Sequence, residues 1–205
     1  MPTSTQRWIN CSTVRMSLHA DARAILAAWA APNEGQEALR GTFIDLLDAQ
    51  PNGMFRHCQP DHLTGSALIV RGDVDADAEV LLVHHSKAGK WVQTGGHCEP
   101  MDSTLSQAAL REAREESGID GLTIDPVPLL LSRHHVTFCG PPPQGGRHLD
   151  VQFLVRAPAG ATIQTDDDED ETRWFPLAPS AVPEPTDQDV RDLIAAATRR
   201  LRGNP

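Results

Sequence analysis

The chain has 205 residues, which suits one compact domain with additions and is short for two full-sized domains. Apolar residues make up 40% and charged residues 22%, a composition that excludes a wholly disordered or fibrous chain. The formal net charge of −10 argues against a basic surface for nucleic acid, because the molecule as a whole repels phosphates.

The chain shows no targeting or membrane-spanning segment. Its longest uncharged apolar stretch, Ala24–Ala31, is far below the roughly 20 residues that cross a bilayer. The N-terminus has no apolar core of signal-peptide length behind a basic start. We therefore expect a cytoplasmic protein that does not bind membranes and whose cysteines are reduced thiols: Cys11, Cys58, Cys98 and Cys139.

Two helices are predicted near the N-terminus. Residues 22–31 form the first, which Pro32-Asn33 interrupts, and residues 36–49 form the second, which ends before Pro51-Asn52-Gly53. We assign residues 1–60 to a helical N-terminal extension. Such an extension could be a dimer-forming arm, a lid or a cover for the sheet that follows.

The central part of the chain changes to strand patterns. Residues 66–71 and 80–85 are short apolar runs separated by an acidic turn, which predicts a hairpin. Residues 87–94 continue extended into Gly95-Gly96. A helix is then predicted from Ser103 or Thr104 to Ser117, because Ser/Thr residues can cap its start and Gly118 can end it.

The last third of the chain mixes strands with one helix. Strands are predicted over 122–131, 133–138, 148–155 and 173–177, and the final helix over about 187–201. Because strands and helices do not alternate regularly, we predict an α+β fold with helices packed against a mixed sheet. Residues 61–205, including the C-terminal helix, form the main domain in this prediction.

The helix that ends at Ser117 changes character along one face. Its N-terminal half presents apolar residues at helical spacing, and the continuing positions are three carboxylates: Glu112, Glu115 and Glu116. Like charges three and four residues apart oppose helix formation, so something must offset them. Either the face is solvated and Arg111 pairs with Glu115, or the carboxylates bind a hard divalent cation such as Mg²⁺ or Mn²⁺.

Gly96 followed by REAREESGI (111–119) resembles the Nudix box, G-x(5)-E-x(7)-R-E-U-x-E-E-x-G-U, in which U is a bulky aliphatic residue. The second half matches, with Ala113 as a small substitute for the first aliphatic residue. The first half is one residue longer than the pattern, and its glutamate is replaced by Asp102 or Ser103. KWVQTGGHCEP before the helix and RWFPL at 173–177 also resemble segments of this family, so the resemblance covers roughly 63–177.

The resemblance implies a Nudix-like fold and hydrolysis of a diphosphate linked to another moiety, usually a nucleoside, with Mg²⁺ or Mn²⁺ as cofactor. By the family pattern, Glu112, Glu115, Glu116 and the Gly96 carbonyl are metal ligands. Arg111 orients the glutamates and joins Glu112 and Glu115 as a catalytic residue. Gly95, Gly96 and His97 are expected to contact the substrate. The partner implied is a small nucleotide-like molecule, and a homodimer is expected because dimers are common in the family.

Several alternatives remain open at this stage. The general base is Glu112, Glu115 or an acid of the run 166–171, and that run is either a further source of metal ligands or a solvated loop. A Nudix-fold module that senses a nucleotide or sugar-nucleotide without turnover is the alternative function, which the altered first half of the box favours and the intact carboxylates disfavour.

The histidines and cysteines give no recognisable zinc motif. His84-His85, His97-Cys98, His134-His135 and Cys139 contain no pair with zinc-finger spacing, so a structural zinc site is not predicted. His134, His135 and His148 lie on predicted strands and are interpreted as packed or surface residues.

Overall fold

A computed structural model describes residues 17–140, 144–165 and 170–203. Cys11 and residues 166–169 of the acidic run lie outside the described residues. The elements, in chain order, are α1 (Leu18–Ala28), α2 (Glu34–Ala49), β1 (Asp61–Arg71), β2 (Glu79–His85), β3 (Lys90–Val92), β4 (Thr94–His97), α3 (Leu105–Ser117), β5 (Thr123–Ile124), β6 (Leu130–Val136), β7 (Gly146–Arg156), β8 (Glu171–Pro176), the short 3-10 helix η1 (Pro179–Ala181) and α4 (Gln188–Leu201).

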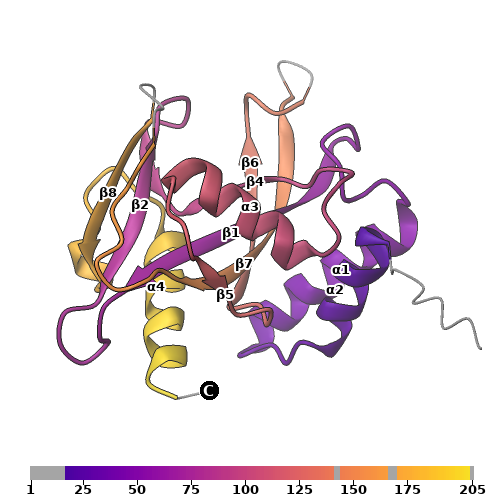
Figure 1. The fold of residues 1–205 in the computed structure, drawn as a ribbon. Helices are drawn as coiled ribbons and strands as arrows, with labels where there is room; N and C mark the ends of the chain where they lie inside the picture. The colour runs from indigo at the N-terminus through magenta and orange to yellow at the C-terminus, as the bar shows by residue number, and fades with distance from the viewer. Residues whose placement is uncertain (1–16, 141–143, 166–169, 204–205) are drawn as a thin grey trace, which may run out of the picture.

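The strands of the described residues form one mixed sheet around β1 (Figure 1). β1 pairs in parallel with β7 along most of its length, and the remaining strand pairs are antiparallel. The other edge of β1 is shared: β4 pairs with its first half and β2 with its last residues. Helices pack on both faces, so the predicted α+β class is confirmed.

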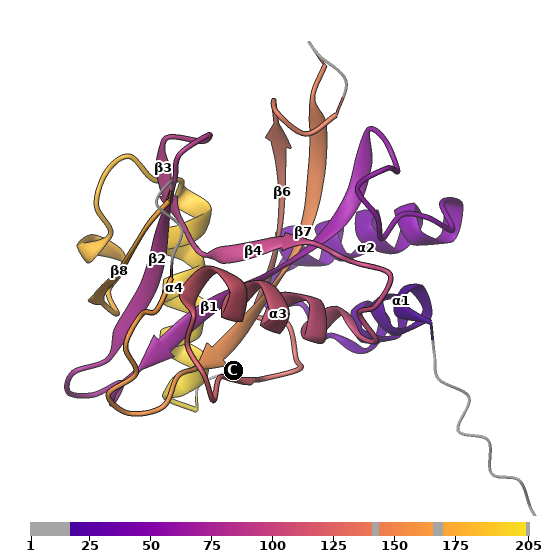
Figure 2. The same ribbon diagram turned by 45° about the horizontal axis from the view of Figure 1, so that its top comes forward.

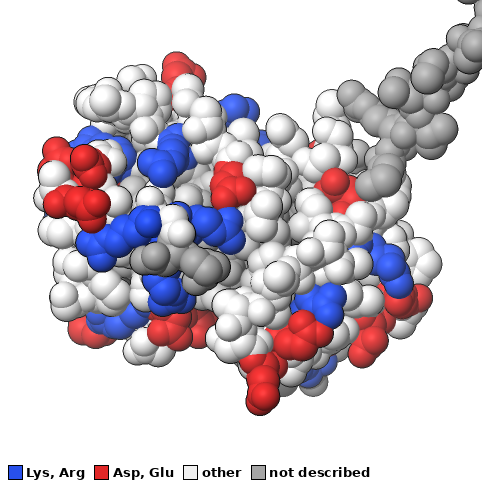
Figure 3. Space-filling view, turned by 90° about the horizontal axis from the view of Figure 1, so that it is seen from below, with Lys and Arg blue, Asp and Glu red and all other residues white. Residues whose placement is uncertain are grey.

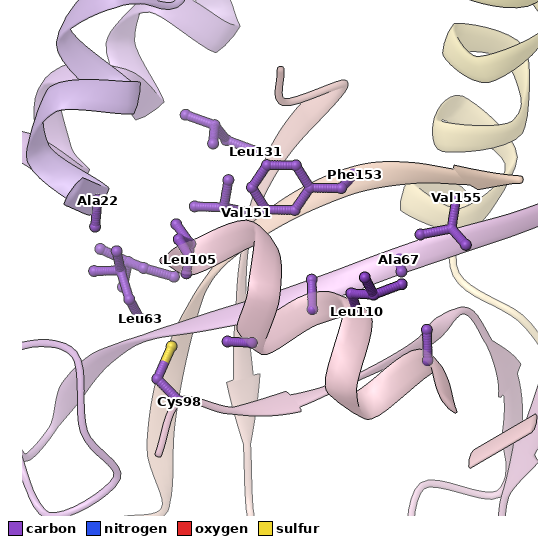
Figure 4. Close-up of a cluster of buried hydrophobic side chains, with 14 of the residues drawn as sticks. Ala22, Leu63, Ala67, Cys98, Leu105, Leu110, Leu131, Val151, Phe153 and Val155 are labelled. Carbon is purple, nitrogen blue, oxygen red and sulfur yellow. The ribbon is translucent and has the colours of Figure 1, made fainter. Parts of the chain in front are cut away.

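Alternation along β1 and β7 divides the core into two layers. Leu63, Ala67 and Ile69 face α3 and the N-terminal helices, together with Val151 and Phe153 of β7. Figure 4 shows Leu105 and Leu110 of α3 in this layer with Leu63 and Phe153. On the opposite face, the second half of β1 packs against α4 through a separate cluster that includes Leu68, Val70, Leu193 and Ile194.

Helix α3 begins and ends where its sequence predicts. The Thr104 side chain accepts a hydrogen bond from Gln107 N at 3.1 Å, which caps the first turn. Gly118 ends the helix in the left-handed region, with φ of 63°. This helix crosses the face of the sheet in front of β1 (Figure 2).

The N-terminal helices cover part of the sheet. Leu26 of α1 and Phe43 of α2 are fully buried in the same cluster as Leu63 and Phe153. His19 Nε2 lies 2.8 Å from the Leu47 carbonyl and Gln36 Nε2 donates to the Leu131 carbonyl, which ties the two helices to each other and to β6. Of the roles considered for this segment, a cover for the sheet agrees with this packing. The domain boundary at residue 60 stays a prediction.

The structure corrects several predicted bounds. The hairpin of β1 and β2 is confirmed, with Ile69 opposite Leu81, but β1 begins earlier, at Asp61. The predicted strand over 122–131 is wrong for most of its length: only Thr123–Ile124 pairs with β7, and the residues from Leu130 belong to β6. Pro126 and Pro128 lack the N–H that a ladder needs, which explains the break.

Surface charge is mixed on the face viewed from below, where acidic and basic side chains lie interspersed (Figure 3). None of the helices that the structure describes combines the length and apolar composition that a bilayer crossing requires.

Candidate active site

A polar cavity lies on the α4 face of the sheet, beyond the N-terminal end of that helix. It exists because the alternating positions of β1 and β7 that face α4 change from polar to apolar along the strands. His62, Thr64 and Ser66 precede Leu68 and Val70 on β1, and β7 repeats the pattern from His148 to Leu154. The apolar half packs on α4, and Thr64, Ser66 and the polar residues of β7 line a cavity of about 810 Å³.

The floor of this cavity holds a buried carboxylate that sequence analysis did not select. Asp150 is 3% exposed and accepts hydrogen bonds from Thr64 Oγ1 at 2.9 Å and Ser66 Oγ at 2.6 Å. Gln93 Nε2 lies 3.4 Å from the same carboxylate. The sequence HLDVQFLV (148–155) could have indicated this residue, because its alternation places Asp150 on an inward face of a strand, where a carboxylate requires hydrogen-bond partners.

Residues of β4 form the cavity wall next to α3. Gly95, Gly96 and His97 line the cavity together with Glu112. A Cβ atom at Gly96 would lie 2.5 Å from the Glu112 carboxylate, and one at Gly95 would lie 2.4 Å from Ser66 Cβ. A side chain at Gly95 would therefore collide with the β1 backbone, and one at Gly96 would displace the Glu112 carboxylate, which lies directly against the β4 backbone.

Glu116 lies one turn further along α3 and is mostly buried. Its Oε2 accepts a hydrogen bond from Gly95 N at 3.1 Å. Burial raises the pKa of this carboxyl to about 8, and the nearby Glu112, Asp170 and Glu115 add to the increase. Burial likewise raises the pKa of Glu112, although Arg111 opposes the shift. Two carboxylates are thus held close together in a site that disfavours their negative charge.

Arg111 connects these acids to the loop before the helix. Its guanidinium donates to Glu112 Oε1 at 2.8 Å, to Glu115 Oε2 at 3.0 Å and to the His97 carbonyl at 2.9 Å. It also donates to both oxygens of Asp102, at 3.2 and 3.1 Å. The hydrogen bonds with Asp102 raise the pKa of Arg111 most. Although the loop has one extra residue, Arg111 still pairs with an acidic residue of the loop, Asp102.

The remaining predicted acids are less enclosed. The Glu115 side chain is 58% exposed and contacts Arg111. In the described part of the acidic run, Asp170 accepts a hydrogen bond from Ser86 N at 2.6 Å and lies close enough to Glu116 to raise its pKa. The structure thus brings Gly95, Gly96, Glu112, Glu116 and Asp170 together.

His97 lines the cavity, and its imidazole points toward other histidines and a cysteine. Its Nε2 lies 3.5 Å from Cys139 Sγ, and its ring centroid lies 5.1 Å from that of His62 and 4.9 Å from that of His148. Burial, with a smaller contribution from the neighbouring imidazoles, lowers the pKa of His97 to about 4 and that of His148 to about 3. Both rings are therefore neutral at pH 7.

The comparison with family models decides the relationship. The model described as the NUDIX domain matches residues 62–197, two thirds of the chain. The chain belongs to the Nudix family of hydrolases. The resemblance noted in the sequence is thereby confirmed, and Gly96 with the helix-borne acids of α3 forms the Nudix box of this hydrolase.

Solved structures share the Nudix fold at low sequence identity. The chain is similar to an Ap4A hydrolase from C. elegans in a binary complex, with a TM-score of 0.54 and 21% identity over 69% of this chain and 98% of the other. It is also similar to a protein from Listeria monocytogenes described as a NUDIX hydrolase, with a TM-score of 0.53 and 16% identity over 69% and 94% of the two chains. A search of curated proteins finds no match.

The Nudix box of this chain has the donor set that a hard divalent cation prefers. The Glu112 carboxylate lies directly against the Gly96 backbone, and the Glu116 carboxylate accepts a hydrogen bond from Gly95 N. Burial raises the pKa of both groups, so their negative charge lacks sufficient compensation. Mg²⁺ and Mn²⁺ bind such oxygens and would supply that compensation. The residues present therefore fit the metal that the family implies.

Proposed function

We propose that the chain hydrolyses the diphosphate linkage of a nucleoside-diphosphate-X type substrate with the help of Mg²⁺ or Mn²⁺. One observation carries the proposal: Glu112 of the Nudix box, with Gly95 and Gly96 beside it, lines a cavity of about 810 Å³. A cavity of this size accommodates a nucleotide-sized molecule. Arg56, Lys87 and Lys90 line it as well and offer positive charge to phosphate groups.

In this proposal the metal is held by Glu112, Glu115, Glu116 and the carbonyl of Gly96. When bound by these residues, such an ion would supply positive charge for the diphosphate and would lower the pKa of a water molecule for attack. Arg111 acts as a positioning residue for Glu112 and Glu115, because its guanidinium contacts both carboxylates. The substrate lies against the wall formed by Gly95, Gly96 and His97.

The general base comes from the same group of acids. Glu112 and Glu115 remain candidates, and Asp170 is the candidate that the described part of the acidic run supplies. Asp170 is supported by its position near Glu116, to which it is electrostatically coupled.

A sensing module without turnover is the alternative. Its main support in the sequence is the altered first half of the box. The pairing of Asp102 with Arg111 weakens that support, because the guanidinium keeps an acidic partner on the loop as well as its contacts to Glu112 and Glu115. We therefore favour catalysis.

A substrate panel tests the proposal. The full chain is incubated with nucleoside triphosphates, ADP-ribose, dinucleoside polyphosphates and nucleotide sugars, with Mg²⁺ or Mn²⁺, and the released products are identified. We expect metal-dependent cleavage of a phosphoanhydride bond in at least one compound. Glu116→Gln should lower turnover at least about 100-fold while the circular dichroism spectrum stays unchanged.

Glu34→Gln on the exposed surface of α2 is the matched control and should keep full activity. Near-normal turnover by Glu116→Gln would refute the site assignment. Tight binding of one panel compound with no cleavage by the wild-type protein would instead establish the sensing function.

Two further proposals concern the state of the protein. A cytoplasmic location and a homodimer follow from the sequence analysis and the family resemblance. Light scattering of the purified chain tests the dimer directly.

A further inference from the structure

Three histidines and one cysteine meet beside the cavity, and His97 and His148 of this group line it. His62 comes from β1, His97 from β4, His148 from β7 and Cys139 from the turn between β6 and β7. One potential ligand atom from each residue can be chosen so that these atoms all lie within 4.8 Å of one another. Among the described residues, this is the group of three or more His, Cys, Asp and Glu side chains whose ligand atoms lie this close together.

The sheet register brings these distant residues together. His62 stands opposite His148 in the parallel pairing of β1 with β7, and the next inward residue of β1, Thr64, stands opposite His97 in β4. The turn after β6 then places Cys139 beside them. β1 and β7 are paired on both of their edges and β4 is paired with β1, so backbone pairing holds the imidazoles in place before any ligand binds.

The distances suit a tetrahedral ion with nitrogen and sulfur ligands. Zinc bonds of ~2.0 Å to nitrogen and ~2.3 Å to sulfur, at a tetrahedral angle, place the two ligand atoms about 3.5 Å apart. Cys139 Sγ lies 3.5 Å from His97 Nε2 and 3.7 Å from His62 Nε2. Two edges of the required tetrahedron are therefore already present.

Hydrogen bonding also prepares the imidazoles. His62 Nδ1 lies 3.0 Å from the carbonyl of Cys58, which can only accept, so this nitrogen carries the proton and Nε2 presents its lone pair toward Cys139. The Nε2 atom of His148 is buried and has no hydrogen-bond partner among the described residues. An unpartnered buried nitrogen is costly, and a metal bond would remove that cost.

We propose that His62, His97, His148 and Cys139 form a closed zinc site. All four positions are filled by protein atoms, as in structural zinc sites, so the ion would not present an open position to a substrate. The site is distinct from the Nudix carboxylates, which have the oxygen ligands that Mg²⁺ and Mn²⁺ prefer. Its role is to fasten the turn after β6 to β1 and to hold the β4 segment that contains Gly95 and Gly96.

Metal analysis and cobalt spectroscopy test the proposal on the full, reduced chain. We expect one zinc ion per chain in the purified protein or after zinc addition, retained in competition with a chromophoric chelator. Cobalt in place of zinc should give the intense visible bands of tetrahedral coordination and a thiolate-to-cobalt band in the near ultraviolet. Cys139→Ser should lose the thiolate band, and His148→Asn should lose the tetrahedral spectrum.

Two controls separate this site from other cysteines and from the Nudix box. Cys58→Ser removes a half-buried thiol nearby and should keep the full cobalt spectrum. Glu116→Gln should retain zinc even if it loses turnover, so that failure of the proposed hydrolysis and failure of the zinc site are distinguishable.

If Cys139→Ser does not fold, the triple variant Cys11→Ser, Cys58→Ser, Cys98→Ala serves instead. Cys139 is then the remaining cysteine, so only its thiolate could produce the band. The proposal is overturned if the wild-type chain binds no zinc in the chelator competition. It is also overturned if folded Cys139→Ser keeps the thiolate band, or if the chain that keeps only Cys139 does not show this band.

Discussion

At the scale of single residues, Glu116 shows how a site for a cation costs stability. Its carboxyl is buried beside Glu112 and Asp170, and its pKa is raised to about 8. A carboxyl group whose pKa is higher in the folded than in the unfolded chain is harder to ionise in the folded state. As the pH rises from about 4.5, where the unfolded carboxyl ionises, to about 8, the folded state therefore loses stability.

This argument gives a prediction for the metal-free protein. Glu116→Gln keeps an acceptor for Gly95 N but cannot ionise, so it should raise the melting temperature after EDTA treatment. We expect the increase to be about 5 °C larger at pH 8 than at pH 5. Differential scanning calorimetry at both pH values measures it, with Glu34→Gln as the control. An equal effect at the two pH values would contradict the burial of an ionisable Glu116.

At the scale of elements, α3 was the part of the site that sequence reasoning could predict. Its caps, its apolar half and its three glutamates are local features, and local features can be read from spacing. The contacts of Asp102 with Arg111 and of Gly96 with Glu112 depend on how the loop and β4 return to the helix. The strand predicted over 122–131 failed because apolar content does not show which residues pair. Leu122 and Leu129 are buried, but Pro126 and Pro128 interrupt the pairing between Ile124 and Leu130.

Gly118 offers a test of how α3 is ended. Its φ of 63° disfavours a side chain, and a Cβ atom there would lie 2.1 Å from the Gln164 carbonyl oxygen. Gly118→Ala should lower the free energy of unfolding by at least about 1–3 kcal/mol, measured by urea denaturation. Gly41→Ala in α2 is the matched control, because nothing lies within 4 Å of its added methyl group. That variant should gain roughly 0.5–1 kcal/mol. Equal effects of the two variants would refute the steric argument.

At the scale of the whole molecule, the N-terminal helices and the sheet share one core. Phe43 of α2 is fully buried in the cluster that contains Leu63 and Phe153. Sequence reasoning predicted two helices before residue 60 but left their role open, because no local pattern states which surface a helix covers. The four residues of the proposed zinc site were not predicted as a site for a similar reason. His62, His97 and His148 become neighbours only through the pairing of β1 with β4 and β7, and the turn after β6 adds Cys139.

A shared core predicts a single cooperative unfolding transition. Phe43→Ala should lower the stability of the entire chain by about 3–5 kcal/mol, because it leaves a cavity between α2 and the sheet. Calorimetry should show one transition shifted to lower temperature, whereas Val127→Ala, at a residue that is 47% exposed, should change little. Two separate transitions, with only one shifted, would show that residues 18–49 fold independently.

The four-residue strand β4 has a consequence for how this enzyme could be inactivated. The side-chain position of Gly96 faces the Glu112 carboxylate, and the side chain of the next residue, His97, faces the Cys139 sulfur. Consecutive residues of β4 therefore face the two proposed metal sites on opposite sides of the strand. Its register against β1 rests on the pairing of residues 94–97 with 64–67. A shift of this register by one residue would turn each side chain of β4 to the opposite side of the strand. It would therefore disrupt the carboxylate site of the Nudix box and the proposed zinc site at the same time.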